Sequence, residues 1–375
     1  MPFADELIGA STAEALAKAV ARAAPDARAT ALDAAAAALA PLPLRGRSDL
    51  LRDALLDDVP GSYATLAATV RRAAAADPEG FGGWLIWPVT SAVAVKAVDE
   101  STEVAFVDAL DLLAELTPRL TSEFAIRTLL EHDLEHALRT ISTWTTSPDP
   151  HVRRLASEGT RPYLPWAKRV GGIVADPGRT LPILNALYRD DSEYVRRSVA
   201  NHLNDLSRIR PDLVVETAAH WLSAADDNTP RVVRHGLRTL IKSGHPEALL
   251  LLGFAVPAQL GVEGPVLSTT SAAIGESVQF TARVTNTGKE SADVAVDYVV
   301  HHLKANGKQT GKTFKLATRT IAPGESVEFS RGHSFRRITT RRYHPGVHAI
   351  ELQVNGVRFG RADFVLRDEE SPAAR

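Results

Sequence analysis

Hydrophobic positions in the first two thirds of the chain recur with the spacing of α-helices. Ser11-Thr12-Ala13-Glu14 has the spacing of a helix-capping box, and Leu16 and Val20 follow it on one helical face. Similar patterns continue to about Leu252. They are interrupted by Pro41, Pro43, Pro60, Pro118, Pro148, Pro150, Pro165, Pro177, Pro211 and Pro230. Because proline ends or kinks a helix, this spacing predicts a series of helical hairpins.

One charged segment recurs along this helical part at an interval of about 40 residues. The pattern around Arg154 and Glu158 is restated by Arg197 and Asn201, and Val233-Arg234 begins a third, weaker copy. Such a period, made of helix pairs, is typical of HEAT-like repeats, which stack into a solenoid. Equivalent positions of successive repeats line the concave surface of a solenoid. We therefore expect these polar and basic side chains to gather there.

After about Pro257 the helical spacing gives way to an alternation of polar and apolar residues. Residues 278–284 alternate with a period of two and are followed by Asn286-Thr287-Gly288, which is typical of a strand ending in a turn. The sequence of residues 275–280 recurs at residues 324–329 with one change, as expected when two strands of a sandwich begin alike. Frequent turn signals over about 105 residues indicate an immunoglobulin-like β-sandwich.

These patterns predict a multidomain α + β protein, in which an all-α HEAT-like repeat solenoid precedes an immunoglobulin-like β-sandwich. We expect an alanine-rich helical region over residues 1–118 that leads into the repeats, and the repeats themselves over residues 119–257. The sandwich is expected over residues 262–368, followed by a frayed tail over residues 369–375.

Composition limits the compartment and the available chemistry. The chain has no cysteine, which excludes disulfides, thiol catalysis and thiolate metal ligands. The N-terminus lacks a basic segment followed by an apolar stretch, and the longest uncharged stretch, residues 80–95, is too short to span a membrane. We therefore expect a soluble, cytoplasmic protein without membrane association. A repeat solenoid gives no reason to expect more than a monomer.

The formal net charge of −2 conceals an uneven distribution of charge. Residues 1–150 contain 12 Lys and Arg against 22 Asp and Glu, residues 151–245 contain 15 against 10, and residues 246–375 contain 16 against 13. Basic charge is therefore concentrated in the repeats, which allows a local patch to bind nucleic acid. Compositional drift alone would also produce this asymmetry.

One predicted helix end combines a carboxylate with arginines. In a helix that opens near residue 150, Arg154, Glu158 and Arg161 share one face. Pro162 then ends the helix, and Trp166 follows closely. Carboxylate, guanidinium and aromatic groups in one place suit the binding of a cation against a polyanion. A solvated stripe stabilised by i,i+4 ion pairs would have the same pattern.

Four segments carry a more specific signal. They are, in order, Gly83-Trp84-Leu85-Ile86-Trp87-Pro88, Thr121-Ser122-Glu123-Phe124-Ala125-Ile126-Arg127, Arg154-Leu155-Ala156-Ser157-Glu158-Gly159-Thr160-Arg161-Pro162 with Pro165-Trp166, and Ser198-Val199-Ala200-Asn201-His202-Leu203-Asn204-Asp205. Through these segments most of the chain resembles the AlkC-type DNA alkylation-repair glycosylases, within the HEAT-like-repeat superfamily that also contains AlkD. Some members carry a C-terminal immunoglobulin-like domain, which agrees with the predicted sandwich.

This resemblance implies an enzyme of base excision repair. The expected activity is hydrolysis of the N-glycosidic bond of 3-methyladenine and 3-methylcytosine in double-stranded DNA, without turning the lesion out of the helix. No cofactor or metal is implied. Glu123 and Glu158 match positions where the family supplies acidic groups. We expect one of them to stabilise an oxocarbenium-like transition state and the other to position water, in either order.

The resemblance also implies residues that contact the lesion and the DNA backbone. Trp166 would contact the sugar or the cationic base, unless it is a packed core residue. Asp205 is a third acidic candidate of lower rank, and the alternative role of either Asn201 or Asp205 is to orient an arginine. The DNA-binding candidates are Arg127, Arg154, Arg161, Arg197 and Asn201. A second basic group in the sandwich, either a DNA contact or a solvated strand face, comprises Arg331, Arg336, Arg337, Arg341 and Arg342.

Three other interpretations compete with this one. His132-Asp133-Leu134-Glu135-His136 fits the pattern of inverted zinc peptidases, but no acidic motif supplies a third metal ligand. Gly311-Lys312-Thr313 resembles the end of a phosphate-binding loop, but Asn306 replaces the first glycine, so we expect a turn with a solvated lysine. A non-catalytic HEAT-repeat scaffold would bind DNA or protein through the same concave surface. Two carboxylates in a basic groove favour the glycosylase.

Overall fold

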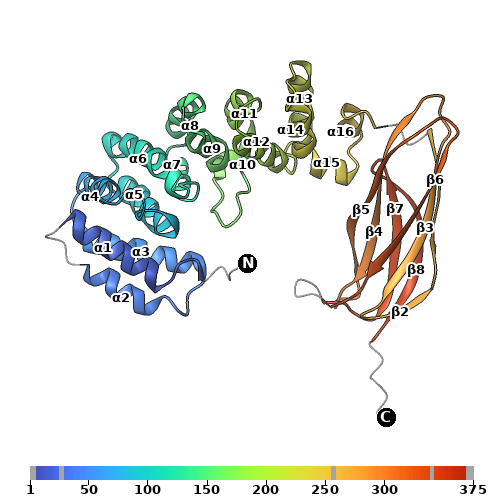
Figure 1. The fold of residues 1–375 in the computed structure, drawn as a ribbon, viewed down its shortest axis with the longest axis horizontal. Helices are drawn as coiled ribbons and strands as arrows, with labels where there is room; N and C mark the ends of the chain where they lie inside the picture. Colours follow the sequence, from blue (N-terminus) through green and yellow to red (C-terminus); the bar gives the residue numbers. More distant parts are fainter. Residues whose placement is uncertain (1–5, 25–28, 255–258, 338–341, 369–375) are drawn as a thin grey trace, which may run out of the picture. The chain divides into compact units, whose positions relative to one another are not determined.

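The computed structural model describes residues 6–24, 29–254, 259–337 and 342–368 (Figure 1). Contacts between Cα atoms divide the chain into two compact units, Met1–Gly236 and Leu237–Arg375, which we describe separately. The predicted tail and Arg341 lie outside the described residues. The expected succession of a helical part and a β-rich part is confirmed.

The first unit is helical throughout its described residues. Its α-helices are α1 (Ala10–Ala23), α2 (Thr30–Ala38), α3 (Leu44–Asp58), α4 (Tyr63–Ala76), α5 (Ile86–Glu100), α6 (Glu103–Leu116), α7 (Ile126–His132), α8 (Leu134–Thr143), α9 (Pro150–Gly159), α10 (Gly171–Ala175), α11 (Leu181–Leu187), α12 (Glu193–Leu206), α13 (Pro211–Ser223) and α14 (Thr229–Gly236). Short 3₁₀ turns are η2 (Gly83–Leu85), η3 (Thr117–Arg119), η4 (Trp144–Thr146) and η5 (Pro177–Thr180).

These helices pair as successive repeats. Helices α5, α7, α9 and α12 follow one another along one side of the unit, and α6, α8, α11 and α13 follow along the other (Figure 1). Helix α12 packs between α9 and α14, so the three copies of the charged pattern belong to neighbouring helices of the stack. Helix α9 begins as predicted. Asp149 caps it by accepting a bond from the backbone N–H of His151 at 2.7 Å, and Pro150 occupies the first turn.

A buried polar clamp joins α12 to the preceding repeat. The ring of His202 is 0% exposed, and its Nδ1 lies 2.9 Å from the backbone oxygen of Ser157 in α9. The Nε2 atom lies 3.1 Å from Oγ1 of Thr180. Burial lowers the pKa of His202 to about 3, so the ring is neutral at physiological pH. This clamp fixes the register of α12 against α9, which carry the residues of the candidate site.

The second unit contains two short helices and a β-sandwich. The helices are α15 (Arg238–Ser243) and α16 (Pro246–Leu251), and the strands are β1 (Leu260–Leu267), β2 (Ser271–Ala273), β3 (Ser277–Asn286), β4 (Ala292–Leu303), β5 (Gln309–Ile321), β6 (Ser326–Ser334), β7 (Gly346–Val354) and β8 (Val357–Arg367). One sheet has the order β1-β3-β6 and the other β2-β8-β7-β4-β5. All pairs are antiparallel except β2 with β8.

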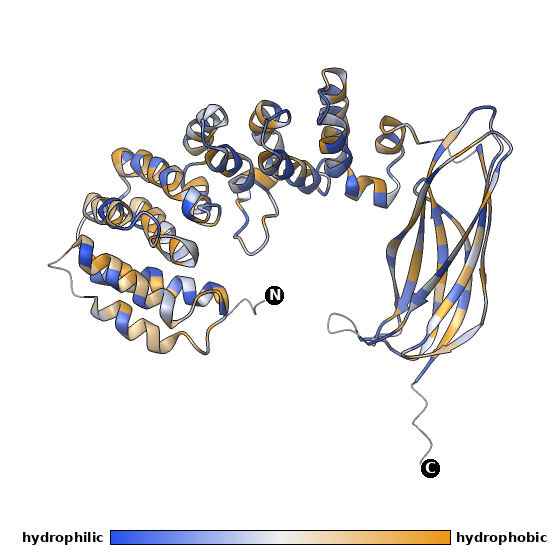
Figure 2. Cartoon of the chain, in the orientation of Figure 1, coloured by the Kyte–Doolittle hydropathy of each residue, from blue (hydrophilic) through white to orange (hydrophobic). Residues whose placement is uncertain are grey.

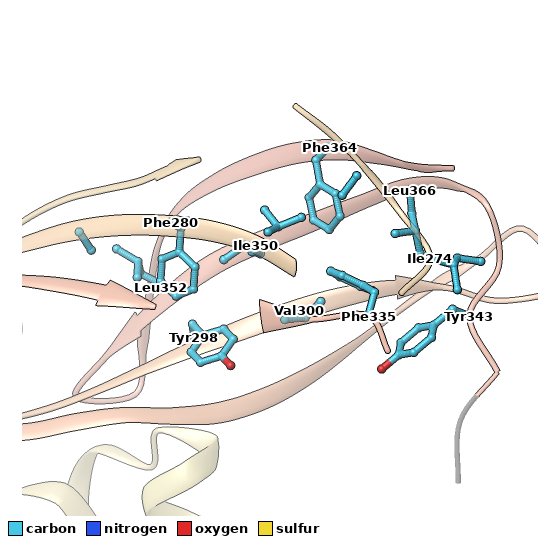
Figure 3. Packing of buried hydrophobic residues seen from close by; sticks show 13 residues of the cluster. Ile274, Phe280, Tyr298, Val300, Phe335, Tyr343, Ile350, Leu352, Phe364 and Leu366 are labelled. Carbon is cyan, nitrogen blue, oxygen red and sulfur yellow. The ribbon is translucent and has the colours of Figure 1, made fainter. Parts of the chain in front are cut away.

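The sandwich follows the predicted alternation of side chains. Along β3 every second residue is buried, and polar and apolar residues alternate along the strands (Figure 2). The two similar segments begin β3 and β6, which pair antiparallel with Val278 opposite His333 and Val284 opposite Val327. Aromatic and branched side chains fill the space between the sheets (Figure 3). The labelled members of this core are Ile274, Phe280, Tyr298, Val300, Phe335, Tyr343, Ile350, Leu352, Phe364 and Leu366.

Helices α15 and α16 belong to the second unit by their contacts. Nε2 of Gln353 on β7 donates to the backbone oxygen of Lys242 on α15 at 2.7 Å. Phe254, which follows α16, forms an isolated bridge with Asp293 on β4. The predicted boundary at residue 257 follows the change from helix to strand, whereas the boundary by contacts comes earlier because these helices pack on the sandwich.

The buried His202 predicts how stability depends on pH. Its folded pKa of about 3 lies below the ordinary value of about 6.5, so its contribution is fully present above about pH 6.5 and is lost as pH falls toward 3. Between pH 7 and pH 5 this residue should lower the unfolding free energy by about 2 kcal/mol. The measurement is urea unfolding of the wild type and His202→Asn at both pH values. Equal pH dependence in the two proteins would contradict this role.

Candidate active site

Glu158 occupies the last turn of α9 and is held by donors from three directions. Its side chain is nearly buried. Oε1 accepts a bond from Nη1 of Arg161 at 2.6 Å and lies 3.7 Å from Nη2 of Arg154. Oε2 accepts a bond from the hydroxyl of Ser198 on α12 at 2.6 Å. These charge-assisted bonds fix the orientation of the carboxylate, which is the condition for electrostatic preorganisation.

Glu123 lies between η3 and α7, and Arg154 joins it to Glu158. Oε2 of Glu123 accepts bonds from Nη1 of Arg154 at 2.8 Å and from the hydroxyl of Thr121 at 2.9 Å. Burial alone lowers the pKa of Arg154, but Glu123 and Glu158 outweigh burial and raise it above its ordinary value. Arg154 also lies over the ring of Tyr194 on α12, with its Cζ 4.9 Å from the ring centre.

Asp205 on α12 completes an alternating row of charges. Its Oδ2 accepts a bond from Nε of Arg161 at 2.9 Å. Burial raises the pKa of the Asp205 carboxyl, although Arg161 acts in the opposite direction. The ion-pair row, as we call it, therefore runs Glu123, Arg154, Glu158, Arg161, Asp205. Three carboxylates meet two guanidiniums, which leaves the row with one excess negative charge.

Trp166 stands beside this row on the segment that connects α9 to α10. It is 60% exposed and has a backbone φ of 62°. An exposed indole on a residue held in the left-handed region is not a packed core residue, and such strain is concentrated at functional sites. Glu123, Glu158 and Trp166 line one open cavity of about 250 Å³, together with Trp84 and Arg161. The sequence-predicted carboxylates and the indole are therefore brought together.

Arg127 on α7 has a different environment from the other arginines. It is 3% exposed, and its Nη1 donates to the backbone oxygens of Gly159 at 3.0 Å and Arg161 at 2.8 Å. Its Nε donates to the backbone oxygen of Lys168. Burial lowers the pKa of Arg127 to about 10, so it keeps its charge at neutral pH. Arg127 thus clamps the Trp166 segment (residues 160–170) from within the protein.

The remaining DNA-binding candidates differ in their surroundings. Arg154 and Arg161 form ion pairs with the carboxylates of the ion-pair row, and both side chains are nearly buried. Arg197 is exposed on α12 and lines a basic groove of about 310 Å³ with Arg196 and Arg231. Asn201 is half-buried one turn after Arg197 and does not line this groove. In the second unit, the described arginines of the predicted basic group are exposed.

Several residues of the site were not singled out from the sequence. Ser198 and Trp84 both lie within the quoted family segments, and Tyr194 lies within the repeated pattern, so segment position is a signal that would have found them. Arg45 on α3 donates to the backbone oxygen of Trp166, and no sequence pattern marks it.

The competing interpretations find little support in the described residues. Glu135 pairs with Arg139 at 3.2 Å, while Nδ1 of His136 lies 3.4 Å from Glu103. Across the described ranges no group of three or more His, Asp or Glu is arranged to hold a metal ion. The expected turn at Gly311-Lys312-Thr313 is wrong, because these residues lie within strand β5. No helix in the described part of the chain is long and apolar enough to cross a bilayer.

Two family models match the chain, one in the helical repeats and one in the sandwich. The family model described as DNA alkylation repair enzyme matches residues 111–239, and the model of the C-terminal Ig-like domain of YhaZ matches residues 261–368. The uncharacterised protein YhaZ of Bacillus subtilis (strain 168) is 32% identical over 323 residues, which cover 86% of this chain and 87% of that protein. The chain therefore belongs to the DNA alkylation repair enzyme family, in the group that carries a C-terminal Ig-like domain.

One solved structure matches the chain over almost its whole length. It is the alkylpurine DNA glycosylase AlkC of Pseudomonas fluorescens, bound to DNA containing an abasic site analog. The two chains are 31% identical with a TM-score of 0.85, and the match covers 98% of this chain and 100% of that chain. The resemblance to AlkC-type proteins predicted from the sequence is confirmed.

The ion-pair row predicts a large effect of removing one arginine. Arg161→Leu leaves the carboxylates of Glu158 and Asp205 nearly buried without their shared partner, so the unfolding free energy at pH 7 should fall by about 3–5 kcal/mol. Arg231→Ala removes an exposed pair with Glu193 and should change it by less than about 1 kcal/mol. Urea unfolding measures both variants. A loss below about 1 kcal/mol for Arg161→Leu would show that the row is not desolvated.

Proposed function

We propose that the protein is a DNA glycosylase that releases cationic N3-alkylated bases, 3-methyladenine and 3-methylcytosine, from double-stranded DNA. The observation that carries the proposal is the cavity lined by Glu123, Glu158 and Trp166, in which two fixed carboxylates face an exposed indole. Family membership and the similarity to AlkC, itself described as an alkylpurine DNA glycosylase bound to DNA with an abasic site analog, support the same activity.

The substrate itself supplies much of the chemistry. N3 methylation gives the base a positive charge, so its bond to C1′ is weakened and the departing base needs no proton. As this bond breaks, its electron pair neutralises the base, and positive charge moves to the sugar, as in glycoside hydrolysis. Water then adds its oxygen to C1′ and gives up one proton. The protein has only to stabilise the sugar cation and to accept that proton.

The two carboxylates divide these tasks in our proposal. Both oxygens of Glu158 are held by donors, so it is a rigid negative charge suited to stabilising the sugar cation. The two bonds described for Glu123 both reach Oε2, which leaves Oε1 to orient water and take its proton. Asp205 does not line the cavity, and its role is to orient Arg161 toward Glu158.

Trp166 and the basic groove provide recognition in this scheme. The face of an exposed indole attracts a cation by about 0.5–2 kcal/mol, which favours charged lesions over normal bases. Arg197 and its neighbours in the groove would bind backbone phosphates. The cavity is open and is lined by the exposed Trp166, which supports excision without turning the base out of the duplex.

The second candidate function is a non-catalytic scaffold that binds DNA or protein. The exposed basic groove on α12 is equally suited to that role. The ion-pair row contains three nearly buried carboxylates and two guanidiniums, and its excess of negative charge repels DNA. Such a row would weaken DNA binding by a scaffold. This excess favours the glycosylase.

Replacement of either cavity carboxylate should abolish most of the activity. Glu158→Gln and Glu123→Gln keep the size of the side chain but remove its charge. The rate of 3-methyladenine release from methylated duplex DNA should then fall about a hundredfold, near 3 kcal/mol in the barrier. The measurement is single-turnover release at matched DNA binding.

Glu135→Gln is the matched control for this experiment. Glu135 is exposed on α8, away from the cavity, and is the general-base position of the zinc-peptidase pattern. The Glu135→Gln variant should release 3-methyladenine at the wild-type rate with or without a chelator. Base release that survives in both Glu158→Gln and Glu123→Gln would overturn the assigned chemistry. Absence of release by the wild type, with duplex binding intact, would leave the scaffold.

A further inference from the structure

A larger cavity lies on the other side of the Trp166 segment and has no role in the chemistry above. Its volume is about 560 Å³, and it lies among α3, α5, α7 and residues Lys168 and Arg169 of that segment. It shares Phe124 with the active-site cavity, where the ring of Phe124 stacks on Trp87 with centres 4.3 Å apart. Phe124 therefore forms part of the wall of both cavities.

The lining of this cavity is cationic. Its basic residues are Arg45, Arg52, Arg127, Lys168 and Arg169, against the two carboxylates of Asp49 and Glu131. Arg52 is already paired with Asp49 and with Asp53, each at 2.7 Å, which leaves Arg45, Arg127, Lys168 and Arg169 against Glu131. Glu131 also accepts a backbone bond from Gly171 at 3.3 Å. The excess of positive charge selects an anion.

One buried donor in the lining lacks a partner. Nε and Nη1 of Arg127 donate to three backbone carbonyls, but its Nη2 is buried and forms no hydrogen bond among the described residues. An unsatisfied buried donor on a charged group is costly, and native structures usually satisfy such a donor with a ligand, ion or water. Lys168, exposed at the same cavity, offers a second cation.

We propose that this cavity binds a phosphate group between Arg127 and Lys168. A phosphate has several acceptor oxygens, which match the two N–H groups of Nη2 and the ammonium of Lys168 at once. It comes either from the backbone of the bound DNA or from free phosphate. The DNA source rests on the proposed function, whereas binding of free phosphate does not.

The site is coupled to the active site through the Trp166 segment. Arg127 holds this segment through the carbonyls of Gly159, Arg161 and Lys168, and Arg45 donates to the carbonyl of Trp166. A phosphate that bonds to the buried Nη2 of Arg127 restrains the same group that sets the path of the segment. Its binding therefore positions Trp166 against the lesion.

Two measurements on the full-length protein test the site. The first is calorimetric titration with inorganic phosphate in chloride buffer at constant ionic strength. Lys168→Ala should weaken binding at least about tenfold, and Lys18→Ala, which changes an exposed lysine on α1, should leave it unchanged. The second is the salt dependence of binding to a duplex, whose slope should fall by about 0.9 in Lys168→Ala only.

Arg127→Lys distinguishes the cavity from a surface lysine effect. This variant keeps the charge but loses the planar fork, so it should weaken the same interaction that Lys168→Ala weakens, provided that circular dichroism shows it folded. If Lys168→Ala and Arg127→Lys both weaken the binding of inorganic phosphate, free phosphate is a ligand of the cavity. If both variants reduce the slope of the salt dependence while inorganic phosphate does not bind, the ligand is a phosphate of the DNA backbone.

The site is overturned if neither measurement responds to Lys168→Ala, or if a folded Arg127→Lys behaves as wild type in both. Release of 3-methyladenine by the same preparations separates this result from the proposed function. Normal release without any phosphate effect refutes only the site. Phosphate binding without release refutes only the glycosylase.

Discussion

The candidate site depends on one physical constraint, which is that carboxylates must remain charged while they are nearly buried. Glu158 is 6% exposed and Asp205 is 4% exposed, and burial raises the pKa of the Asp205 carboxyl. Arg154 and Arg161 lie between the carboxylates and supply positive charge, and each forms ion pairs with two of them. Buried ion pairs contribute little net stability, so this row is better explained by the negative charge that it presents to a substrate.

The repeat architecture makes such a row possible. Glu123 precedes α7, Glu158 lies in the last turn of α9 and Asp205 lies on α12, so each carboxylate comes from a different layer of the stack. Bonds between layers hold these elements in register, including the His202 clamp and the bidentate pair of Arg153 with Asp190, at 2.6 and 3.0 Å. Arg127 then fixes the segment that carries Trp166. The geometry of the site is therefore set by how the layers stack.

Local pattern predicted the elements and one face of the site. The capping residue Asp149 and the spacing of Arg154 and Glu158 were enough to place both side chains on α9. The bond between Arg161 and Asp205 spans 44 residues of sequence and depends on packing between repeats, which local spacing does not determine. For the same reason, the burial of Arg127 and the exposure of Trp166 emerged only from the three-dimensional structure, because arginine is usually exposed and tryptophan usually buried.

The central claim is that fixed carboxylates stabilise charge on the sugar while no group protonates the departing base. The direct test is single-turnover release from duplexes that differ only in the charge of the damaged base, with cationic 3-methyladenine in one and neutral hypoxanthine in the other. The expected result is release of 3-methyladenine and no release of hypoxanthine above the uncatalysed background. Release of hypoxanthine at a comparable rate would require a general acid and would contradict this mechanism.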